Sequence, residues 1–186
     1  MRIDALLLSV EPVVANPANS PCRAQSKSLL NLSVLGINLG VLSAQTTTSA
    51  VTLLSTAEAN TAKLGILNLL GILLHVSADA LDAKAQVQLS SHGCVLSSSS
   101  TVTNAVIQGK PISLLTTPLD IAVPLVGVIH LNATLGGDHP SFGPPNHNVV
   151  AQRALWLEVT DPLLALVLRD VIVSEAIADV SLATCI

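Results

Sequence analysis

The residues best suited to chemistry lie in a Gly- and Pro-rich stretch, GGDHPSFGPPNHN, at residues 136–148. Asp138, His139 and His147 supply a carboxylate and two imidazoles, which are groups that zinc and copper accept as ligands. Their spacing is long and no regular element fixes their geometry, so an ordinary solvated loop is the alternative. We therefore expect no metal and no cofactor, with these three residues as the candidates if a metal is bound.

Other groups give weaker indications of a reactive site. Asp79 and Asp82, with Glu58 nearby, have carboxylates for calcium, but no ladder with calcium-loop spacing accompanies them. The serines are abundant but low in complexity, and no G-x-S-x-G motif occurs. His75 lies in an alternating segment, which favours a half-exposed strand residue over a general base. We expect a protein that is not an enzyme.

Three cysteines are present, and none belongs to a C-x-x-C pair. Cys185 is the penultimate residue and Cys94 lies in a turn-like SSHGC, so a disulfide between them is the pairing we predict. Cys22 lies in a Pro-rich segment, where an unpaired thiol indicates a cross-link between copies. The alternative is that two or all three cysteines are reduced and buried.

The elements around these residues have the period of two that strands show. In SADALDAKAQVQLSS, from Ser77 to Ser91, apolar and polar residues alternate, and one slip near Leu81–Asp82 restores a continuous apolar face. Gln108–Lys110 reads as a tight hairpin turn, and a break near Pro124 separates two further strands. Thr56–Lys63 reads as a polar connection. The stretch 162–178 has helical spacing, but its β-branched residues favour a strand.

About nine to eleven strands with turn signals between them predict an all-β fold. We expect an antiparallel β-sandwich, jelly-roll or immunoglobulin-like. Aromatic residues make up only 1% of the chain. The core must therefore consist of Leu, Val, Ile and Ala, whose buried apolar area still stabilises a fold.

The first residues differ from the rest. Residues 2–14 are apolar, and residues 15–28 form a polar, Pro-containing linker. We therefore divide the chain into a segment at 1–28 and a sandwich domain at 29–186. The segment is either donated to the sheet of a neighbouring copy or packed on its own domain as an edge strand. The residues expected to contact the neighbour are Ile3, Leu6, Leu7, Leu8, Val10, Val13 and Val14.

Composition excludes several partners. Only 11% of the residues are charged, against roughly 25% in ordinary soluble domains. Such a poorly charged surface favours burial against other copies, so we expect a homo-oligomer. Eight scattered Lys and Arg residues and a net charge of −4 argue against nucleic-acid binding. The apolar run at 64–76 is shorter than the roughly 20 residues that a membrane helix needs, so we expect no membrane insertion.

The start, MRIDALLLSVEPVVANP, does not read as a signal peptide, because Asp4 interrupts a short apolar core and no small-residue cleavage site follows. We expect either the mature chain or another export route. Assembly on a structure released by lysis, such as a spore, is a third possibility.

Several motifs, in order, resemble the choice-of-anchor P family of bacterial secreted or surface domains. They are LLGILLHVSADA at Leu69–Ala80, then Cys94, SSSSTVTNAVIQGKPIS at Ser97–Ser113, and ALWLEVTDPLLALVLRDVIVSEAIADV at Ala154–Val180. Asn104–Ile112 fills the hairpin slot, while Ala154–Thr160 and Asp170–Ser174 fill the closing slots. The resemblance implies a secreted or surface β domain and carries no catalytic residue. The chain differs from the family in lacking a recognisable C-terminal anchor and in having the apolar N-terminal segment.

Together these patterns predict a structural subunit of an extracellular filament, pilus-like fibre or surface appendage, located outside the cell or on the cell or spore surface. Copies would assemble when the N-terminal strand is donated to the next subunit. The alternative is a monomeric cell-surface adhesin or carbohydrate-binding module. With one Trp, one Phe and no Tyr, that alternative has few rings for sugar stacking.

Overall fold

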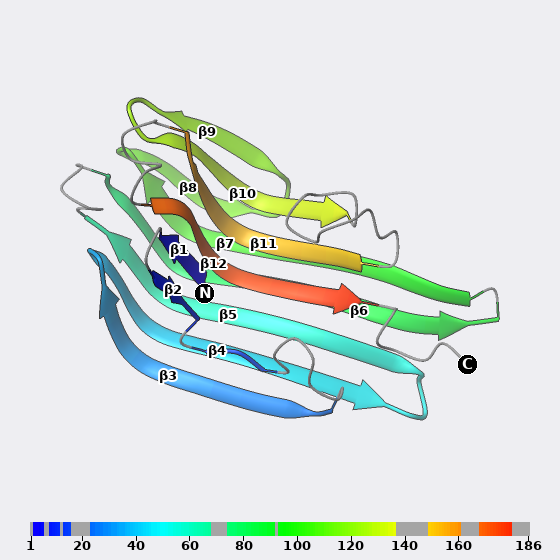
Figure 1. Ribbon diagram of the computed structural model, residues 1–186. Coiled ribbons are helices and arrows are strands. Elements are labelled where there is room, and N and C mark those ends of the chain that lie inside the picture. The colour runs from blue at the N-terminus through cyan, green and yellow to red at the C-terminus, as the bar shows by residue number, and fades with distance from the viewer. Residues whose placement is uncertain are drawn as a thin grey trace.

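The computed structural model is built from strands packed in two layers (Figure 1). It describes residues 2–5, 8–11, 13–15, 23–67, 74–91, 93–136, 149–160 and 168–179, with the side chains of 2–10 and 168–169 left undescribed. The strands are β1 Arg2–Ala5, β2 Leu8–Val10, β3 Gln25–Val34, β4 Ile37–Ser49, β5 Leu54–Ile66, β6 Val76–Ser90, β7 Gly93–Ile107, β8 Lys110–Leu115, β9 Leu119–Val123, β10 Gly127–Gly136, β11 Val149–Val159 and β12 Leu168–Asp179.

Two antiparallel six-stranded sheets form the sandwich. Sheet A has the order β2-β1-β12-β11-β10-β9, and sheet B has the order β3-β4-β5-β6-β7-β8. The predicted antiparallel β-sandwich is confirmed, and the ten strands β3–β12 fall within the predicted nine to eleven. Nearly every strand lies beside its neighbour in the chain, and the pair β1–β12 brings the two ends of the fold together. The connectivity is therefore a meander, without the Greek-key crossing of a jelly roll or an immunoglobulin domain.

The core lies between the middle strands of the two sheets. β12 packs on β5 and β6, and β11 packs on β6 and β7. Alternate residues point inward, as the period of two requires, and the largest buried side chains include Leu81, Ile107, Leu131, Leu155 and Leu157. Small alanines such as Ala83 and Ala85 on β6 fill the space between them. The expected aliphatic core is what the described residues show.

A bend runs across sheet B. Asn31 on β3, Lys63 on β5 and Asn104 on β7 have positive φ values of 53°, 58° and 48°. The pairing register skips one position at Asn31 against β4, at Lys63 against β4 and β6, and at Asn104 against β8, and it skips two positions at Asn104 against β6. A left-handed residue costs about 1–2 kcal/mol unless it is Gly or a short polar residue, so two of the three positions hold Asn. All strands of the sheet curve together near this line (Figure 1).

The same bend explains the slip predicted in β6. Ala78 and Leu81 are both buried, so the inward face changes parity between them rather than at Leu81–Asp82. The cause lies on the partner strands, because Lys63 and Asn104 are the left-handed residues that flank this point. β6 itself contributes no left-handed residue to the bend. Sequence alternation within β6 therefore detected a distortion that its neighbours create.

Sheet A has an equivalent bend. Asn132 on β10 and Ser174 on β12 have φ values of 53° and 56°, and the register skips at Ala154 between them. Both side chains reach across the sandwich. Ser174 Oγ contacts Thr61 Oγ1 at 2.8 Å and the Leu81 carbonyl oxygen at 2.9 Å. The two bends are thus tied to each other by buried hydrogen bonds.

Several local predictions are settled by these strands. The turn at Gln108–Gly109 has two positive φ values, 49° and 79°, as a tight hairpin turn requires. β9 and β10 are separated at Pro124 as predicted, and 168–179 is a strand rather than a helix. Thr56–Lys63 is not a connection but the middle of β5. Its small and polar residues alternate between the inner face of the sheet, which is lined with Ala, and the outer face, which contacts solvent.

The N-terminal segment packs on the sandwich of its own chain. β1 pairs with β12 of the same chain, and Val13 is buried in the same core as the sandwich residues. Of the two alternatives for this segment, the structure has the strand packed on its own domain, and the division at residue 28 stays a prediction. The physical reason is that the edge of β12 away from β11 has unpaired backbone groups, which β1 pairs over four register positions.

Candidate functional site

The seam between β1 and β12 is the first candidate, because the predicted contact residues lie there. It has four register pairs, with a bulge between Asp4 and Ala5: Arg2–Ile172, Ile3–Val171, Asp4–Asp170 and Ala5–Leu168. Among the strand pairs of sheet A in which neither strand is at an edge, this seam has the fewest register pairs.

The predicted contact residues divide between described and undescribed parts. Ile3 lies on β1, while Leu8 and Val10 lie on β2, which pairs with β1. Val13 is buried and Val14 is partly buried in the same molecule. Leu6 and Leu7 lie outside the described residues. A second copy could occupy this position only by replacing the segment that already fills it.

Four strands lie at sheet edges, and they are unequal. In the described part of the chain β2, with three residues, and β9, with five, are short, and β8 carries Lys110 and Pro111. Short strands, Lys and Pro are the usual means of protecting an edge. β3 carries Lys27, but it has ten residues and no proline, and its Leu30 side chain is 67% exposed. β3 is therefore the least protected edge.

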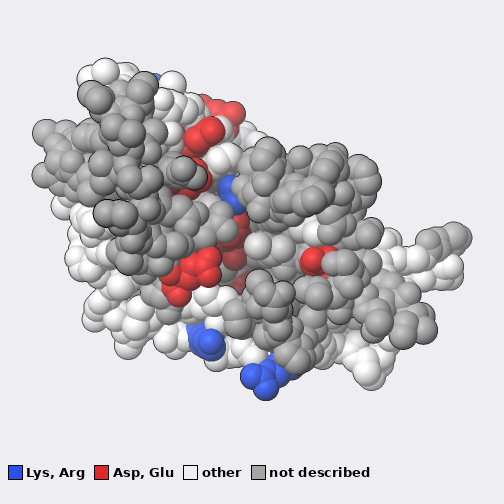
Figure 2. Space-filling view, in the orientation of Figure 1, with Lys and Arg blue, Asp and Glu red and all other residues white. Residues whose placement is uncertain are grey.

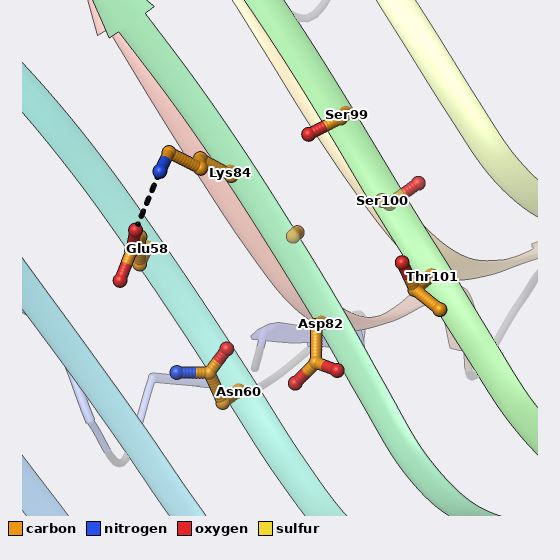
Figure 3. A pocket seen from close by; sticks show the side chains of 8 residues that line it. Glu58, Asn60, Asp82, Lys84, Ser99, Ser100 and Thr101 are labelled. Carbon is orange, nitrogen blue, oxygen red and sulfur yellow. Dashed lines mark ion pairs between the residues drawn. The ribbon is translucent and has the colours of Figure 1, made fainter. Parts of the chain in front are cut away.

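A shallow hollow of about 250 Å³ lies on the outer face of sheet B, across β5, β6 and β7. Figure 3 shows its polar side chains in two rows: Glu58, Lys84 and Ser99 in one, and Asn60, Asp82 and Thr101 in the other. Lys84 Nζ lies 3.1 Å from Glu58 Oε1. Hydroxyl, amide, ammonium and carboxylate groups thus face solvent without an aromatic ring among them. Such a surface can hydrogen-bond a polyhydroxylated ligand.

Asp82 is the perturbed titratable group of this hollow. Burial, and to a smaller extent the nearby Glu58 carboxylate, raise the pKa of Asp82 above its ordinary value. Asp79, the other carboxylate considered for calcium, accepts a hydrogen bond from Asn104 Nδ2 at 2.9 Å. Within the described ranges no group of three His, Cys, Asp or Glu side chains is arranged to hold a metal ion.

A ladder of aromatic and charged side chains lies on the outer face of sheet A. Trp156 on β11 stacks on His130 of β10, with ring centroids 4.6 Å apart, and the guanidinium of Arg153 lies 4.7 Å from the Trp156 ring. The indole Nε1 donates to Asp170 Oδ1 at 2.8 Å, and Arg153 Nε donates to Glu175 Oε1 at 2.7 Å. The register of β10, β11 and β12 brings these groups together.

Two carboxylates flank the imidazole of this ladder. Asp120 Oδ1 lies 2.8 Å from His130 Nδ1, and Glu158 Oε2 lies 3.3 Å from His130 Nε2. The Asp120 and Glu158 side chains are 70% and 45% exposed, so this end of sheet A presents negative charge to solvent. Arg153 is 1% exposed, and among the described residues its Nη2 atom has no hydrogen-bond partner. Its stacking on Trp156 is the contact that stabilises this end of the guanidinium.

A second polar network is buried between the sheets. Gln152 accepts hydrogen bonds from Ser98 Oγ at 2.9 Å and Thr134 Oγ1 at 2.6 Å, and its Nε2 donates to Ser100 Oγ at 2.6 Å. Ser100 Oγ donates to Asn132 Oδ1 at 2.8 Å. These groups satisfy one another, as buried polar groups must. The network fixes the packing of the two sheets and has no arrangement of nucleophile and base.

The remaining predicted residues are only partly placed. Cys94, near the start of β7, is disulfide-bonded. Cys22 and Cys185 lie outside the described residues, so the Cys94–Cys185 pairing and the intermolecular role of Cys22 remain predictions. Asp138, His139 and His147 also lie outside the described residues. His75 is exposed just before β6.

The Trp156 ladder was missed in the sequence. His130, Arg153 and Asp170 lie on three different strands, and only the pairing register brings them together. The alternation of β11 places Trp156 and Glu158 on one face, which was the single available signal. In the part of the chain that the structure describes, no helix has the length and apolarity to cross a membrane.

Searches against protein-family models, curated proteins and solved structures found no match to this chain.

Proposed function

We propose that this chain is a non-catalytic structural subunit of an extracellular filament or surface appendage, and that copies join when β1 leaves its own β12 and pairs with β12 of the next copy. The observation that carries the proposal is the seam itself. Exchange replaces each contact of the closed subunit with an identical contact between copies, which is why swapping an element is a low-cost route to assembly.

Three features favour exchange at this seam over exchange elsewhere. The seam has four register pairs and one bulge. Fourteen residues, 11–24, separate β2 from β3, and an extended chain of that length spans up to about 46–50 Å. β2 pairs with β1 and moves with it, so among the described strands of sheet A only the contact between β1 and β12 must break. Exchange of this kind is heterologous and grows into an open polymer when the rotation between copies does not close a ring.

The test is a disulfide that forms only between copies. One population carries Ile3→Cys and a second carries Val171→Cys, positions that lie opposite each other in the register. Mixed under assembly conditions and then oxidised, the two variants are expected to give a covalent dimer on a non-reducing gel. The control is each variant alone, which lacks the matching thiol.

A chain with both substitutions supplies the second control. Assembled before oxidation it is expected to give covalent polymers, and oxidised when dilute it is expected to give closed monomers. If the mixture gives no dimer above the background of the wild-type cysteines, while the double variant closes within one chain, exchange at the seam does not occur.

The alternative, a surface-attached adhesin or carbohydrate-binding module, is favoured by one observation. The hydroxyls of Ser99 and Thr101 face the hollow on sheet B beside the carboxylates of Glu58 and Asp82. The test is binding of soluble polysaccharides followed by calorimetry, with Ser99→Ala and Thr101→Ala as variants. Retention of a polysaccharide by a monomer, and its loss in these variants, would favour this function over assembly.

A further inference from the structure

Charge is distributed unevenly between the two sheets. Residues 23–115, which build sheet B, hold five Lys and Arg residues against three Asp and Glu, a net charge of +2. The rest of the chain holds three against nine, a net charge of −6. Figure 2 shows Lys and Arg atoms along the lower margin, where Figure 1 has β3 and β4, and Asp and Glu atoms over the middle and upper parts.

Two exposed cations of sheet B lie near β3, its least protected edge strand. Lys27 on β3 and Lys63 on β5 are exposed and have no ion pair within the described ranges. Lys63 lies against Gly40 of β4, because a Cβ atom at Gly40 would come within 3.1 Å of the Lys63 Cβ. Leu30 and Val41 stand opposite each other in the register and are 67% and 38% exposed on the outer face, whereas Lys27 shares the other face of the edge strand with Leu29, so the four residues surround the β3 edge from both sides. We call these four residues the β3 patch.

The negative end lies at the opposite margin of the molecule. β9 is the last strand of sheet A and follows β8, the last strand of sheet B, after three residues. Asp120 on β9 and Glu158 on β11 present carboxylates there, and Leu119 at the start of β9 is 37% exposed. In the described part of the chain β9 pairs with β10 alone. We call Leu119, Asp120 and Glu158 the β9 patch.

We propose that the β3 patch of one copy docks against the β9 patch of a second copy, with the two free strand edges side by side. Each patch contains an exposed leucine and charged side chains at a free strand edge. The charges of the two patches are opposite in sign. Two copies of the same patch would repel, which disfavours a closed dimer and selects the head-to-tail contact. Because the patches lie at opposite margins, repetition of the contact is not self-limiting.

This contact deepens the proposed function, since it rests on the protein being a self-assembling subunit, but it does not require strand exchange. It is measured in a chain whose seam is closed by an oxidised Ile3→Cys/Val171→Cys pair, so that exchange cannot contribute. Sedimentation velocity at 20 mM NaCl is expected to detect association that weakens at least tenfold by 300 mM NaCl, because exposed charges are screened within about 10 Å at 0.1 M salt.

Charge reversal identifies the partners. In the seam-closed chain, Lys27→Glu with Lys63→Glu, and separately Asp120→Lys with Glu158→Lys, are each expected to weaken self-association at least tenfold. An equimolar mixture of the two variants is expected to restore it, because the reversed β3 patch then meets the reversed β9 patch. Lys110→Glu, on β8 at the margin of the β9 patch, is the charge-reversal control and is expected not to weaken self-association, because it makes that margin more negative.

Several results would overturn the proposal. They are a seam-closed chain that stays monomeric at low salt, association that salt does not weaken, and a Lys110→Glu loss equal to that of the β3 patch variant. A mixture that fails to associate would also overturn it, provided both variants keep the wild-type melting temperature. Polymers that form only when the seam is free would leave strand exchange as the sole contact and likewise refute docking of the patches.

Discussion

One of the two left-handed residues in the bend of sheet A is a buried asparagine, and its replacement is the most informative test of the fold. Asn132 is 1% exposed and has a φ of 53°. Its Nδ2 donates to the carbonyl oxygens of Leu115 at 2.9 Å and Thr117 at 3.2 Å, and its Oδ1 accepts from Ser100 Oγ at 2.8 Å. The side chain thus ties the bend in β10 to β7 and to the end of β8.

Replacement of Asn132 by alanine removes two separate contributions to stability. Buried partners left without a hydrogen bond cost about 1–3 kcal/mol. Alanine in the left-handed region costs about 1–2 kcal/mol. We therefore expect Asn132→Ala to lower the free energy of unfolding by about 3 kcal/mol. Asn132→Gly relieves the backbone strain and is expected to lower it by about 2 kcal/mol.

The matched control is Asn31, which has the same φ of 53° but an exposed side chain. Asn31→Ala is expected to lower the free energy of unfolding only through the strained backbone, by about 1 kcal/mol. Urea unfolding of each variant, with an unchanged dependence on denaturant, gives the free energies. If Asn132→Ala and Asn31→Ala destabilise the protein equally, the buried hydrogen bonds contribute nothing and the reasoning is wrong.

Three further predictions test other parts of the account. Gly127→Ala would place its Cβ against the carbonyl oxygen of the neighbouring strand, so a loss of more than about 2 kcal/mol in urea unfolding is expected, whereas Gly65→Ala, where the added Cβ meets nothing within 4 Å, should change stability by less than about 1 kcal/mol. The pKa of Asp82 in the folded state is raised above its ordinary value of 3.8, so ionisation of this side chain weakens the fold as the pH rises above 3.8. Asp82→Asn should therefore be more stable than the wild type at pH 7 and lose that advantage near pH 3. A stability difference that is the same at both pH values would contradict this. A non-reducing peptide map should join Cys94 to Cys185, and Cys185→Ser should lower the free energy of unfolding by about 2–4 kcal/mol; a map that joins Cys94 to another cysteine would refute the pairing.

The sequence predicted those features that depend on local pattern. Alternation along 77–91 identified a strand and its change of face, and Gln108–Gly109 identified a turn, because both follow from side-chain period and backbone preference. The strand at 56–63 was missed because Ala and Thr face inward there, where larger apolar residues were expected. The bend of sheet B was detected only as this change of face in β6, because its left-handed residues belong to other strands and no single segment contains the pattern.

The candidate sites depended more on contacts between strands that are far apart in the sequence. His130 and Trp156 are 26 positions apart, and only the β10–β11 register stacks them. The sequence predicted that the N-terminal segment is a strand that pairs with the edge of a sheet. Its sequence could not distinguish its own β12 from the same edge in another copy, because the two edges are chemically identical.

Electron microscopy of the seam-closed chain tests the central claim most directly. The purified Ile3→Cys/Val171→Cys chain, oxidised when dilute and then concentrated at 0.5 M NaCl to screen the charged patches, is expected to remain as single particles. Addition of a reductant that opens this bond, at a dose that leaves the wild type able to polymerise, is expected to produce filaments. Filaments of wild-type length before reduction would contradict exchange of the N-terminal strand, and so would single particles in the wild type itself.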